Sequence, residues 1–368
     1  MLPLTPSQTR LLRQRAQHLH PRPTASVPEI VSALCGIQTQ EMEAGFLSIG
    51  VRSVGLTANA VLRALSEDQS IVRTWTMRGT LHLVAAEDLV WMLPLFGPGF
   101  IRGNRKRRLD LGLDDETGER GVRLLRDLLG VRGPLTKAEI VEVLSVKGIP
   151  MEGQAFIHLI GLAAAQGWVC YGPPRGKKDT FVLLEDWLGI SAGFGNPARA
   201  ERESIEKLAH RYLSAFAPAT VEDFASWSGL SLRDCRAAWK KLALVETRTG
   251  NTNFWLLENQ TDWLDALEDH PPIVRLLPRY DTYLLGYADR SLIIDPAHAH
   301  HIYPGGGMIH PAVLVDGQVV GRWKTIRKRD RVEIEVEPFG ELSREIQDAL
   351  EAEIHSVVHF IEHFHLLK

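Results

Sequence analysis

Cysteine pairs, long apolar runs and an export signal are missing from this sequence. Three cysteines occur in 368 residues, Cys35, Cys170 and Cys235, and they form no Cys-x-x-Cys pair. This usage excludes a disulfide framework and favours buried thiols in a reducing compartment. No apolar run approaches the ~20 residues of a membrane helix. The N-terminal segment MLPLTPSQTRLLRQRAQHLH lacks an apolar signal core, so we expect a cytoplasmic protein.

The common catalytic and metal-binding motifs are also missing. The sequence has no Gly-x-Ser-x-Gly, His-Glu-x-x-His or Walker pattern, and the GGG of residues 305–307 lacks the strand, helix and lysine of a phosphate loop. His355, His359 and His363 would share one helical face, and four histidines lie in residues 298–310. Either group could bind a metal, but a packed stripe and an ordinary loop are favoured because no further ligand is evident. We predict no metal and no organic cofactor.

The net charge of −3 taken alone argues against a nucleic-acid partner, but the basic residues are grouped. Residues 102–108 (RGNRKRR) hold five basic residues and no acid, residues 174–178 (PRGKK) hold three, and residues 322–331 hold six with one Asp. The acids collect in residues 113–119 and 332–337. One such cluster is usually a solvated face, whereas three together favour a phosphate-binding surface.

Two segments of the chain share one plan. Residues 132–186 and 216–259 each begin with Pro and a capping Thr, continue through two helical patterns separated by a Gly-containing turn, and close on two short strands around a polar tip. A third, less regular copy fits residues 27–85, with Arg78-Gly79 between its strands. Helix, turn, helix and β-hairpin is the plan of a winged helix, a DNA-binding motif. The alternative is a set of packing helices in an unrelated α+β protein.

The C-terminal third changes character. Residues 273–338 alternate between apolar and polar positions with Gly-containing turns, which predicts a small antiparallel sheet or barrel. A long amphipathic helix is expected after it, begun by a capping box at Ser343. The predicted fold is therefore α+β, with three tandem winged helices that form a concave DNA-binding surface, a C-terminal β-barrel-like element and a terminal helix. The predicted domain ranges are 1–112, 113–192, 193–268 and 269–368.

Two amides flank one threonine in GIQTQ, residues 36–40. On a continuous helix the side chains of Gln38 and Gln40 would diverge by about 200°. They can converge only where the helix ends, and Gly36 allows such an end. An amide can orient a water molecule but is not a base at neutral pH. A site of this kind can hydrolyse only a bond that is already weak.

An N7-alkylated purine nucleoside has such a bond, because its cationic base leaves as a neutral molecule without an acid catalyst. Water then captures the oxocarbenium-like sugar, and two amide oxygens could hold that water and face the developing positive charge. From the residues alone, a structural role for Gln-x-Gln is still favoured, since the pattern is common by chance. Asp281 and Asp289 could form an acid–base pair, but a role in turns is again favoured.

Four stretches resemble the bacterial AlkZ/YcaQ family of winged-helix DNA glycosylases: GIQTQ (36–40), IVRTWTMRGTLHLV (71–84), LLPRYDTYLLGYADR (276–290) and HPAVLVDGQVVGRW (310–323). The resemblance covers nearly the whole chain. The family signature is Gln, an aliphatic residue and Gln in the AlkZ branch, with Asp as the last residue in the YcaQ branch. Gln38 and Gln40 match the AlkZ branch, whereas Thr39 is polar where an aliphatic residue is usual.

The resemblance implies three winged helices around a DNA-sized concavity and activity on cationic N7-alkylguanine. In AlkZ-type members this includes interstrand crosslinks made by nitrogen-mustard-like or azinomycin-type agents, and some members are self-resistance proteins. It also implies a β-hairpin that approaches DNA near the lesion, which we place at residues 307–320 with His310 at its start. We expect an open concave site, because a crosslinked base cannot easily be flipped out of the duplex.

We therefore predict a monofunctional DNA glycosylase of DNA repair, with Gln38 and Gln40 as catalytic residues. We expect a monomer that acts on double-stranded DNA at the nucleoid, without a membrane partner. The alternative is a non-catalytic winged-helix transcription regulator. The roles of His82, Asp281 and Arg290 stay open. The candidate DNA contacts besides His310 are Arg102, Arg105, Lys106, Arg107, Arg108, Arg175, Lys177 and Lys178.

Overall fold

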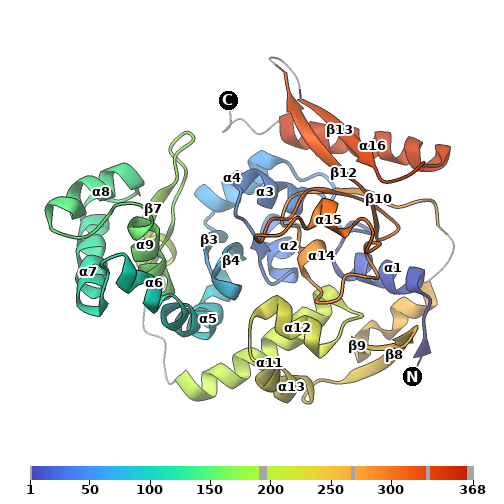
Figure 1. Cartoon of the computed structure of the whole chain (residues 1–368), viewed down its shortest axis with the longest axis horizontal. Coiled ribbons are helices and arrows are strands. Elements are labelled where there is room, and N and C mark those ends of the chain that lie inside the picture. Colours follow the sequence, from blue (N-terminus) through green and yellow to red (C-terminus); the bar gives the residue numbers. More distant parts are fainter. Residues whose placement is uncertain (1, 190–196, 267–269, 329–331, 363–368) are drawn as a thin grey trace. The chain divides into compact units, whose positions relative to one another are not determined.

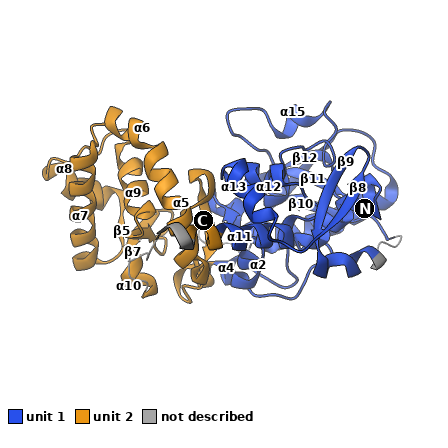
Figure 2. Ribbon diagram, turned by 90° about the horizontal axis from the view of Figure 1, so that it is seen from below, with its two compact units in different colours: residues 1–61, 205–365 blue, residues 62–204, 366–368 orange. Residues whose placement is uncertain are grey.

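The computed structural model describes residues 2–189, 197–266, 270–328 and 332–362. The chain forms two compact units (Figure 2), of which unit 1 comprises Met1–Val61 with Ile205–His365 and unit 2 comprises Leu62–Ser204. Unit 1 therefore joins segments from both ends of the sequence. Within the described ranges, no helix is long and apolar enough to cross a membrane.

Unit 2 contains one of the two regular copies of the predicted plan (Figure 1, green). Thr136 caps its first helix: its backbone N–H donates to Glu139 Oε2 at 2.7 Å, in the capping box expected from the sequence. The second helix is buried along almost its whole length, and a hairpin follows it. The elements are α7 (Asp115–Arg132), β5 (Leu135–Thr136), α8 (Lys137–Val146), α9 (Ala155–Ala165), β6 (Val169–Tyr171), β7 (Thr180–Leu183) and α10 (Leu184–Leu188).

The N-terminal part of unit 2 is a second hairpin followed by helices. All residues of its two strands are buried, and the turn between them places Arg78 at φ 54° and Gly79 at φ 69°. Helix α4 (Ala58–Ser66) precedes the strands, as predicted from TANAVLRALSE. The other elements are β3 (Ile71–Trp75), β4 (Leu81–Ala85), α5 (Leu89–Gly103) and α6 (Arg105–Asp110).

Unit 1 contains the N-terminal helices and the other regular copy of the plan. In that copy Thr220 caps the first helix through a capping box with Asp223, and a stack of aromatic rings around Tyr212 fills the core. The N-terminal strand pairs in parallel with the hairpin. The elements are β1 (Leu2–Pro3), α1 (Pro6–Ala16), α2 (Val27–Ala33), β2 (Ile37–Gln38), α3 (Met42–Gly50), α11 (Pro197–Phe216), α12 (Val221–Ser228), α13 (Leu232–Trp239), β8 (Leu244–Thr249) and β9 (Thr252–Leu257).

The C-terminal part of unit 1 is a four-stranded antiparallel sheet in the order β10-β11-β12-β13. Its end strands β10 and β13 do not pair with each other, so the sheet is open and the prediction of a barrel-like element was wrong. The terminal helix packs against β10 and β13 (Figure 1). The elements are β10 (Val274–Leu277), α14 (Thr282–Leu285), α15 (Ala299–Ile302), β11 (Ala312–Val315), β12 (Gln318–Arg327), β13 (Val332–Pro338) and α16 (Arg344–Glu362).

Candidate active site

The helix before the two amides ends ahead of Gly36, which is the condition under which the two amides can converge. Helix α2 stops at Ala33, and Cys35 (φ 55°) and Gly36 (φ 99°) turn the chain into the short strand β2. Gln38 is the last residue of β2 and Gln40 lies two residues later in a bend, so the backbone no longer forces the two amides onto divergent faces of a helix. Gln38 is 9% exposed and Gln40 is exposed, which gives one anchored amide and one at the surface.

Thr39, between the two amides, points into the protein and is fully buried. Its Oγ1 donates to the carbonyl of Ile37 at 2.8 Å, so the hydroxyl is satisfied although an aliphatic residue is usual here. Gly45 of α3 packs against it so closely that a Cβ there would lie 2.5 Å from Thr39 Oγ1. Helix α3 therefore holds the centre of the Gln-x-Gln segment in place.

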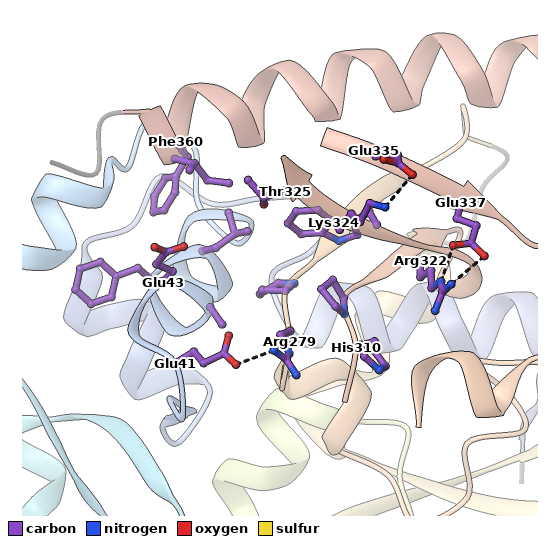
Figure 3. Close-up of a pocket in the computed structure, with 17 residues that line it drawn as sticks. Glu41, Glu43, Arg279, His310, Arg322, Lys324, Thr325, Glu335, Glu337 and Phe360 are labelled. Atoms are coloured by element: carbon purple, nitrogen blue, oxygen red, sulfur yellow. Dashed lines mark hydrogen bonds and ion pairs between the residues drawn. The ribbon is translucent and has the colours of Figure 1, made fainter. Parts of the chain in front are cut away.

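Two ion pairs connect the residues after Gln40 to the segment that follows β10 and to β12. Glu41 accepts from Arg279 at 2.8 Å (Figure 3), and Glu43 accepts from Arg327 of β12 at 2.8 Å. All four side chains are partly exposed, so each pair is worth about 1 kcal/mol or less. Their contribution is geometric, because they fix where α3 begins.

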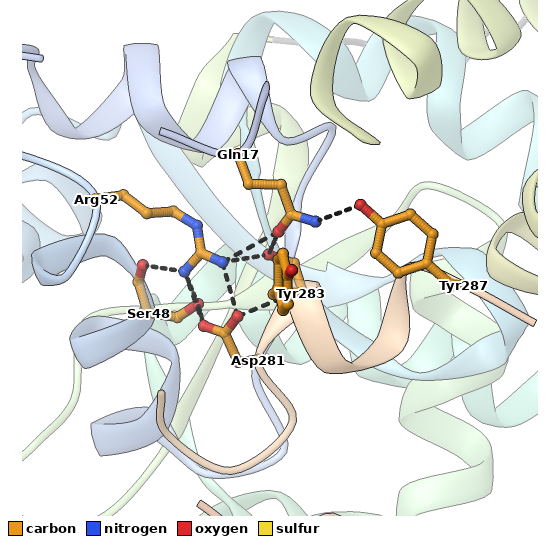
Figure 4. Close-up of polar contacts among 7 residues, drawn as sticks. Gln17, Ser48, Arg52, Asp281, Tyr283 and Tyr287 are labelled. Carbon is orange, nitrogen blue, oxygen red and sulfur yellow. Dashed lines mark hydrogen bonds and ion pairs between the residues drawn. The ribbon is translucent and has the colours of Figure 1, made fainter. Parts of the chain in front are cut away.

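The other end of α3 leads into a buried polar network (Figure 4). Arg52 donates to both carboxylate oxygens of Asp281 at 2.7 Å, and both side chains are completely buried. Ser48 of α3 also donates to Asp281 at 2.7 Å, and Gln17 accepts from Arg52 at 3.2 Å. Bidentate geometry of this kind orients both partners. The network links α3 to the segment after α1 and to α14, which Asp281 caps through the N–H of Tyr283.

The hydrogen bonds of Asp281 and Asp289 bear on whether these two aspartates could form an acid–base pair. Asp281 is occupied by Arg52, whereas Asp289 is exposed and accepts from the N–H of Ser291 at 2.8 Å. Neither carboxylate is placed to act with the other as an acid–base pair, and the structural interpretation of both is confirmed. Arg52 was not singled out in the sequence, although an arginine in the apolar stretch GFLSIGVRSV is a recognisable signal of a buried ion pair.

Unit 1 contains a pocket of about 600 Å³ lined by residues of α3, of the C-terminal sheet and of α16 (Figure 3). Glu41, the neighbour of Gln40 in the chain, is one of its lining residues, and His310 is another. Burial and the charges of Arg279 and Arg322 lower the pKa of His310. The ring is therefore mostly neutral at pH 7.

Comparison with known proteins identifies the family. The family model for AlkZ-like DNA glycosylases matches residues 31–360. The chain belongs to this family and is a DNA glycosylase. It is 29% identical over 360 residues to an interstrand DNA cross-link repair glycosylase from Streptomyces sahachiroi, which covers 93% of this chain and 92% of the relative. The solved structure of Streptomyces sahachiroi DNA glycosylase AlkZ matches with a TM-score of 0.79 and 26% identity, over 98% of this chain and 97% of that chain.

The candidate phosphate contacts of this AlkZ-like glycosylase differ in exposure and in whether they already form an ion pair or hydrogen bond within the protein. Arg108 is 4% exposed and donates to the carbonyl of Ile101 at 3.0 Å. It supports α6 internally and is removed from the candidates. The exposed Arg105 and Arg175 already pair with Asp115 and Glu139, and Arg107 donates to Gln154. Of the candidates, Arg102, Lys106, Lys177 and Lys178 are exposed and have no ion pair or side-chain hydrogen bond among the described residues.

The third basic cluster, residues 322–331, is largely neutralised by the acidic cluster that follows it in the sequence. Strands β12 and β13 place Arg322 opposite Glu337 and Lys324 opposite Glu335, and both pairs form ion pairs of 2.7 and 3.0 Å. Residues 329–331 lie outside the described ranges. The basic cluster and the acidic cluster, which are separate in the sequence, therefore form one surface of paired opposite charges on β12 and β13.

The hairpin placed at residues 307–320 does not project from the protein. Its turn at Asp316-Gly317 packs inside unit 1, where Tyr283 Oη donates to the carbonyl of Gly317 at 2.9 Å and Arg10 donates to that of Asp316 at 3.1 Å. The tip is thus held by unit 1, and the approach of this hairpin to DNA stays a prediction. His310 stays a candidate contact through its position in the pocket.

The histidine groups do not form a metal site in the part of the chain that the structure describes. His298 and His301 stack against Phe339 with ring centroids 4.7 and 5.1 Å apart, which gives the histidine-rich loop a packing role. His363, the last member of the helical stripe, lies outside the described residues.

His82 and Arg290, whose roles the sequence left open, both make contacts within the protein. His82 is buried in β4, its Nδ1 lies 3.0 Å from the carbonyl of Thr80, and burial, with the charge of Arg78, lowers its pKa to about 3. Arg290 lies over the ring of Tyr303 at 4.1 Å from its centroid. We assign neither residue a catalytic role.

Proposed function

We propose that this DNA glycosylase hydrolyses the N-glycosidic bond of cationic N7-alkylguanine, including guanines joined in interstrand crosslinks. The observation that carries the proposal is the end of α2 at Ala33, before Gly36. Gln38 therefore closes the short strand β2 and Gln40 follows in a bend, so the two amides do not lie on divergent faces of one helix. The cross-link repair activity named for the Streptomyces sahachiroi relative supports the substrate class.

The proposed chemistry needs no strong acid or base. The bond between the sugar C1′ and the base nitrogen breaks, and its electron pair neutralises the positive base, which leaves. The amide oxygens of Gln38 and Gln40 orient a water molecule and stabilise the cationic sugar. The water oxygen bonds to C1′ and its proton passes to solvent, so the products are a neutral alkylated base and an abasic site.

The enzyme is expected to leave the DNA strand intact. Strand cleavage by a glycosylase requires an amine nucleophile that forms a Schiff base with the sugar. The lysine that lines the pocket of about 600 Å³, Lys324, is held by Glu335 at 3.0 Å. We therefore propose a monofunctional enzyme.

We further propose that the helix–helix–hairpin segments act as three winged helices that together form a concave DNA-binding surface. The domains would be residues 1–112, 113–192, 193–268 and 269–368, in a monomer. Helix order and capping in α8–β7 and α12–β9 support two of these winged helices. The alternative of a non-catalytic transcription regulator is not favoured, because the chain belongs to a glycosylase family.

The test is base release from a duplex with one N7-methylguanine. We expect the wild-type enzyme to give a cut strand only after alkali treatment, which cleaves abasic sites. Gln38→Ala and Gln40→Ala should bind the duplex but release no base. Gln347→Ala, an exposed glutamine of α16, is the matched control and should behave like wild type. Undiminished release by Gln40→Ala would contradict the assigned chemistry.

A further inference from the structure

The pocket that Glu41 and His310 line is large and walled by distant parts of the chain. Its volume of about 600 Å³ lies within the range of about 300 to 1,000 Å³ that is usual for sites of small organic molecules. The walls come from α3, from the residues after β10 and before β11, from β12 and β13, and from the end of α16 (Figure 3). All of these segments belong to unit 1.

Apolar side chains form much of the pocket surface. Trp323 of β12 is buried and fixed by a hydrogen bond of 2.9 Å from its indole N–H to the carbonyl of Leu277. Aromatic rings held in this way offer flat apolar surface at little cost in conformational entropy. The apolar lining residues are Ala44, Phe46, Leu47, Pro278, Pro311, Trp323, Phe360 and Ile361.

The charged side chains around the pocket are already paired with one another. Arg279 binds Glu41, and the two cross-strand pairs of β12 and β13 occupy Arg322 and Lys324. Four glutamates and three cations line the pocket. The fourth glutamate, Glu43, pairs with Arg327, which does not line the pocket. This lining leaves no cation for a phosphate and suits a neutral or weakly basic ligand. An unmodified nucleobase, which needs several hydrogen-bond partners, fits it poorly.

We propose that this pocket binds the substituent carried on N7 of the damaged guanine, of the class of uncharged or weakly basic apolar groups that include an aromatic ring. This inference rests on the proposed function. The N7 atom lies at the major-groove edge of the base, so a substituent there projects out of the stack. Glu41 directly follows Gln40 and lines the pocket, so a substituent on a guanine held at the amides would have the pocket within reach.

Binding of the substituent in the pocket would make the enzyme prefer bulky lesions over small ones. A methyl group on N7 leaves the pocket empty, whereas an aryl substituent gains apolar contact there. If this contact is retained in the transition state, it raises kcat/KM for the bulky lesion relative to the methylated one. Specificity would then come from the substituent, and catalysis from Gln38 and Gln40.

The test places a large side chain in the pocket by substituting an exposed residue that lines it. Thr325 of β12 is exposed and lines the pocket, and strands accept aromatic residues readily, so Thr325→Trp should fold. The matched control is Ile326→Trp, at the next position of the same strand, which is not among the residues that line the pocket. The two substrates are duplexes with one N7-methylguanine or with one half-reacted aromatic nitrogen mustard on guanine N7.

We expect Thr325→Trp to lower the ratio of kcat/KM, mustard adduct over methyl adduct, by about tenfold or more. Ile326→Trp should keep the wild-type ratio. An unchanged ratio in Thr325→Trp, or an equal fall in both variants, would overturn the assignment of the pocket.

A binding measurement separates the pocket from the chemistry. Calorimetry with the fully hydrolysed aromatic mustard, an unreactive diol, should show binding to wild type and Ile326→Trp and none to Thr325→Trp. Absence of binding to wild type, or equal binding to all three proteins, would overturn the pocket proposal. Binding with this pattern but no release of either base would keep the pocket and refute the proposed glycosylase substrate.

Discussion

Single residues set the geometry of the proposed catalytic segment. The backbone turns at Cys35 and Gly36, Thr39 anchors the middle, and the two amides flank that anchor. The position of the segment depends on close packing, such as that of Gly45 against the side chain of Thr39.

Gly45→Ala should disturb the segment, since the new Cβ would lie 2.5 Å from Thr39 Oγ1. We expect a loss of about 1–3 kcal/mol in the free energy of unfolding and a large fall in base release. Urea denaturation and the alkali assay measure the two effects. Gly99→Ala, on α5 with open space around its Cβ, is the control and should not lose stability. Normal activity of Gly45→Ala would show that α3 does not position the amides.

His82 should make the protein sensitive to acid. Its folded pKa of about 3 lies below the ordinary value of 6.5, so between these values the unfolded state binds more protons. Its contribution to stability is complete above pH 6.5 and is lost as the pH falls towards 3, by up to about 1.4 kcal/mol per pH unit. His82→Leu should flatten this part of the stability curve in urea titrations at several pH values. The exposed His210→Leu should leave the curve unchanged.

At the scale of elements, the buried network around Arg52 holds α3 to α14 and to the end of α1. Helix α3 is thus fixed at its start by two ion pairs at the surface and near its end by a buried one. The surface pairs contribute little energy. The buried pair orients the two elements, and loss of one partner alone would leave a buried charge without compensation.

Asp281→Asn should leave Arg52 as an uncompensated buried charge. We expect a loss of about 3–5 kcal/mol in the free energy of unfolding. The double variant Arg52→Met/Asp281→Leu removes both charges and should recover most of this loss. Denaturation of Arg52→Met, Asp281→Leu and the double variant gives the coupling energy. Strictly additive losses would show that the two side chains do not act as a pair.

At the scale of the whole molecule, unit 2 presents exposed cations without acidic partners, among them Lys177 and Lys178 on the β6–β7 hairpin. These two lysines follow Arg175, which is tied to Glu139. A phosphate contact depends on such available charge and not on the total count of basic residues.

Lys177→Gln/Lys178→Gln should weaken duplex binding equally for all sequences. Each lost phosphate contact should reduce the salt dependence of log Kd by about one unit of slope. Fluorescence anisotropy with undamaged duplex at several salt concentrations measures this slope. Lys147→Gln, at the exposed end of α8, is the control and should keep the wild-type slope. An unchanged slope in the double variant would remove this hairpin from the DNA-binding surface.

The sequence by itself determined the local features of this protein. Capping residues such as Thr136 and Thr220 marked where helices begin, and Gly36 marked the end of α2 before the amides. The Gln-x-Gln segment and its surroundings indicated the family. These signals are local because a cap, a turn or an alternating strand depends on neighbours in the chain.

Only the tertiary structure decided which charges and cavities are available. Arg108 looked like its exposed neighbours but is buried, the basic strand β12 meets the acidic strand β13, and the tip of the β11–β12 hairpin packs inside. The pocket is assembled from segments as distant as Glu41 and Phe360. Burial, ion pairing and cavities arise from contacts between residues far apart in the chain, so composition and spacing along one sequence do not determine them.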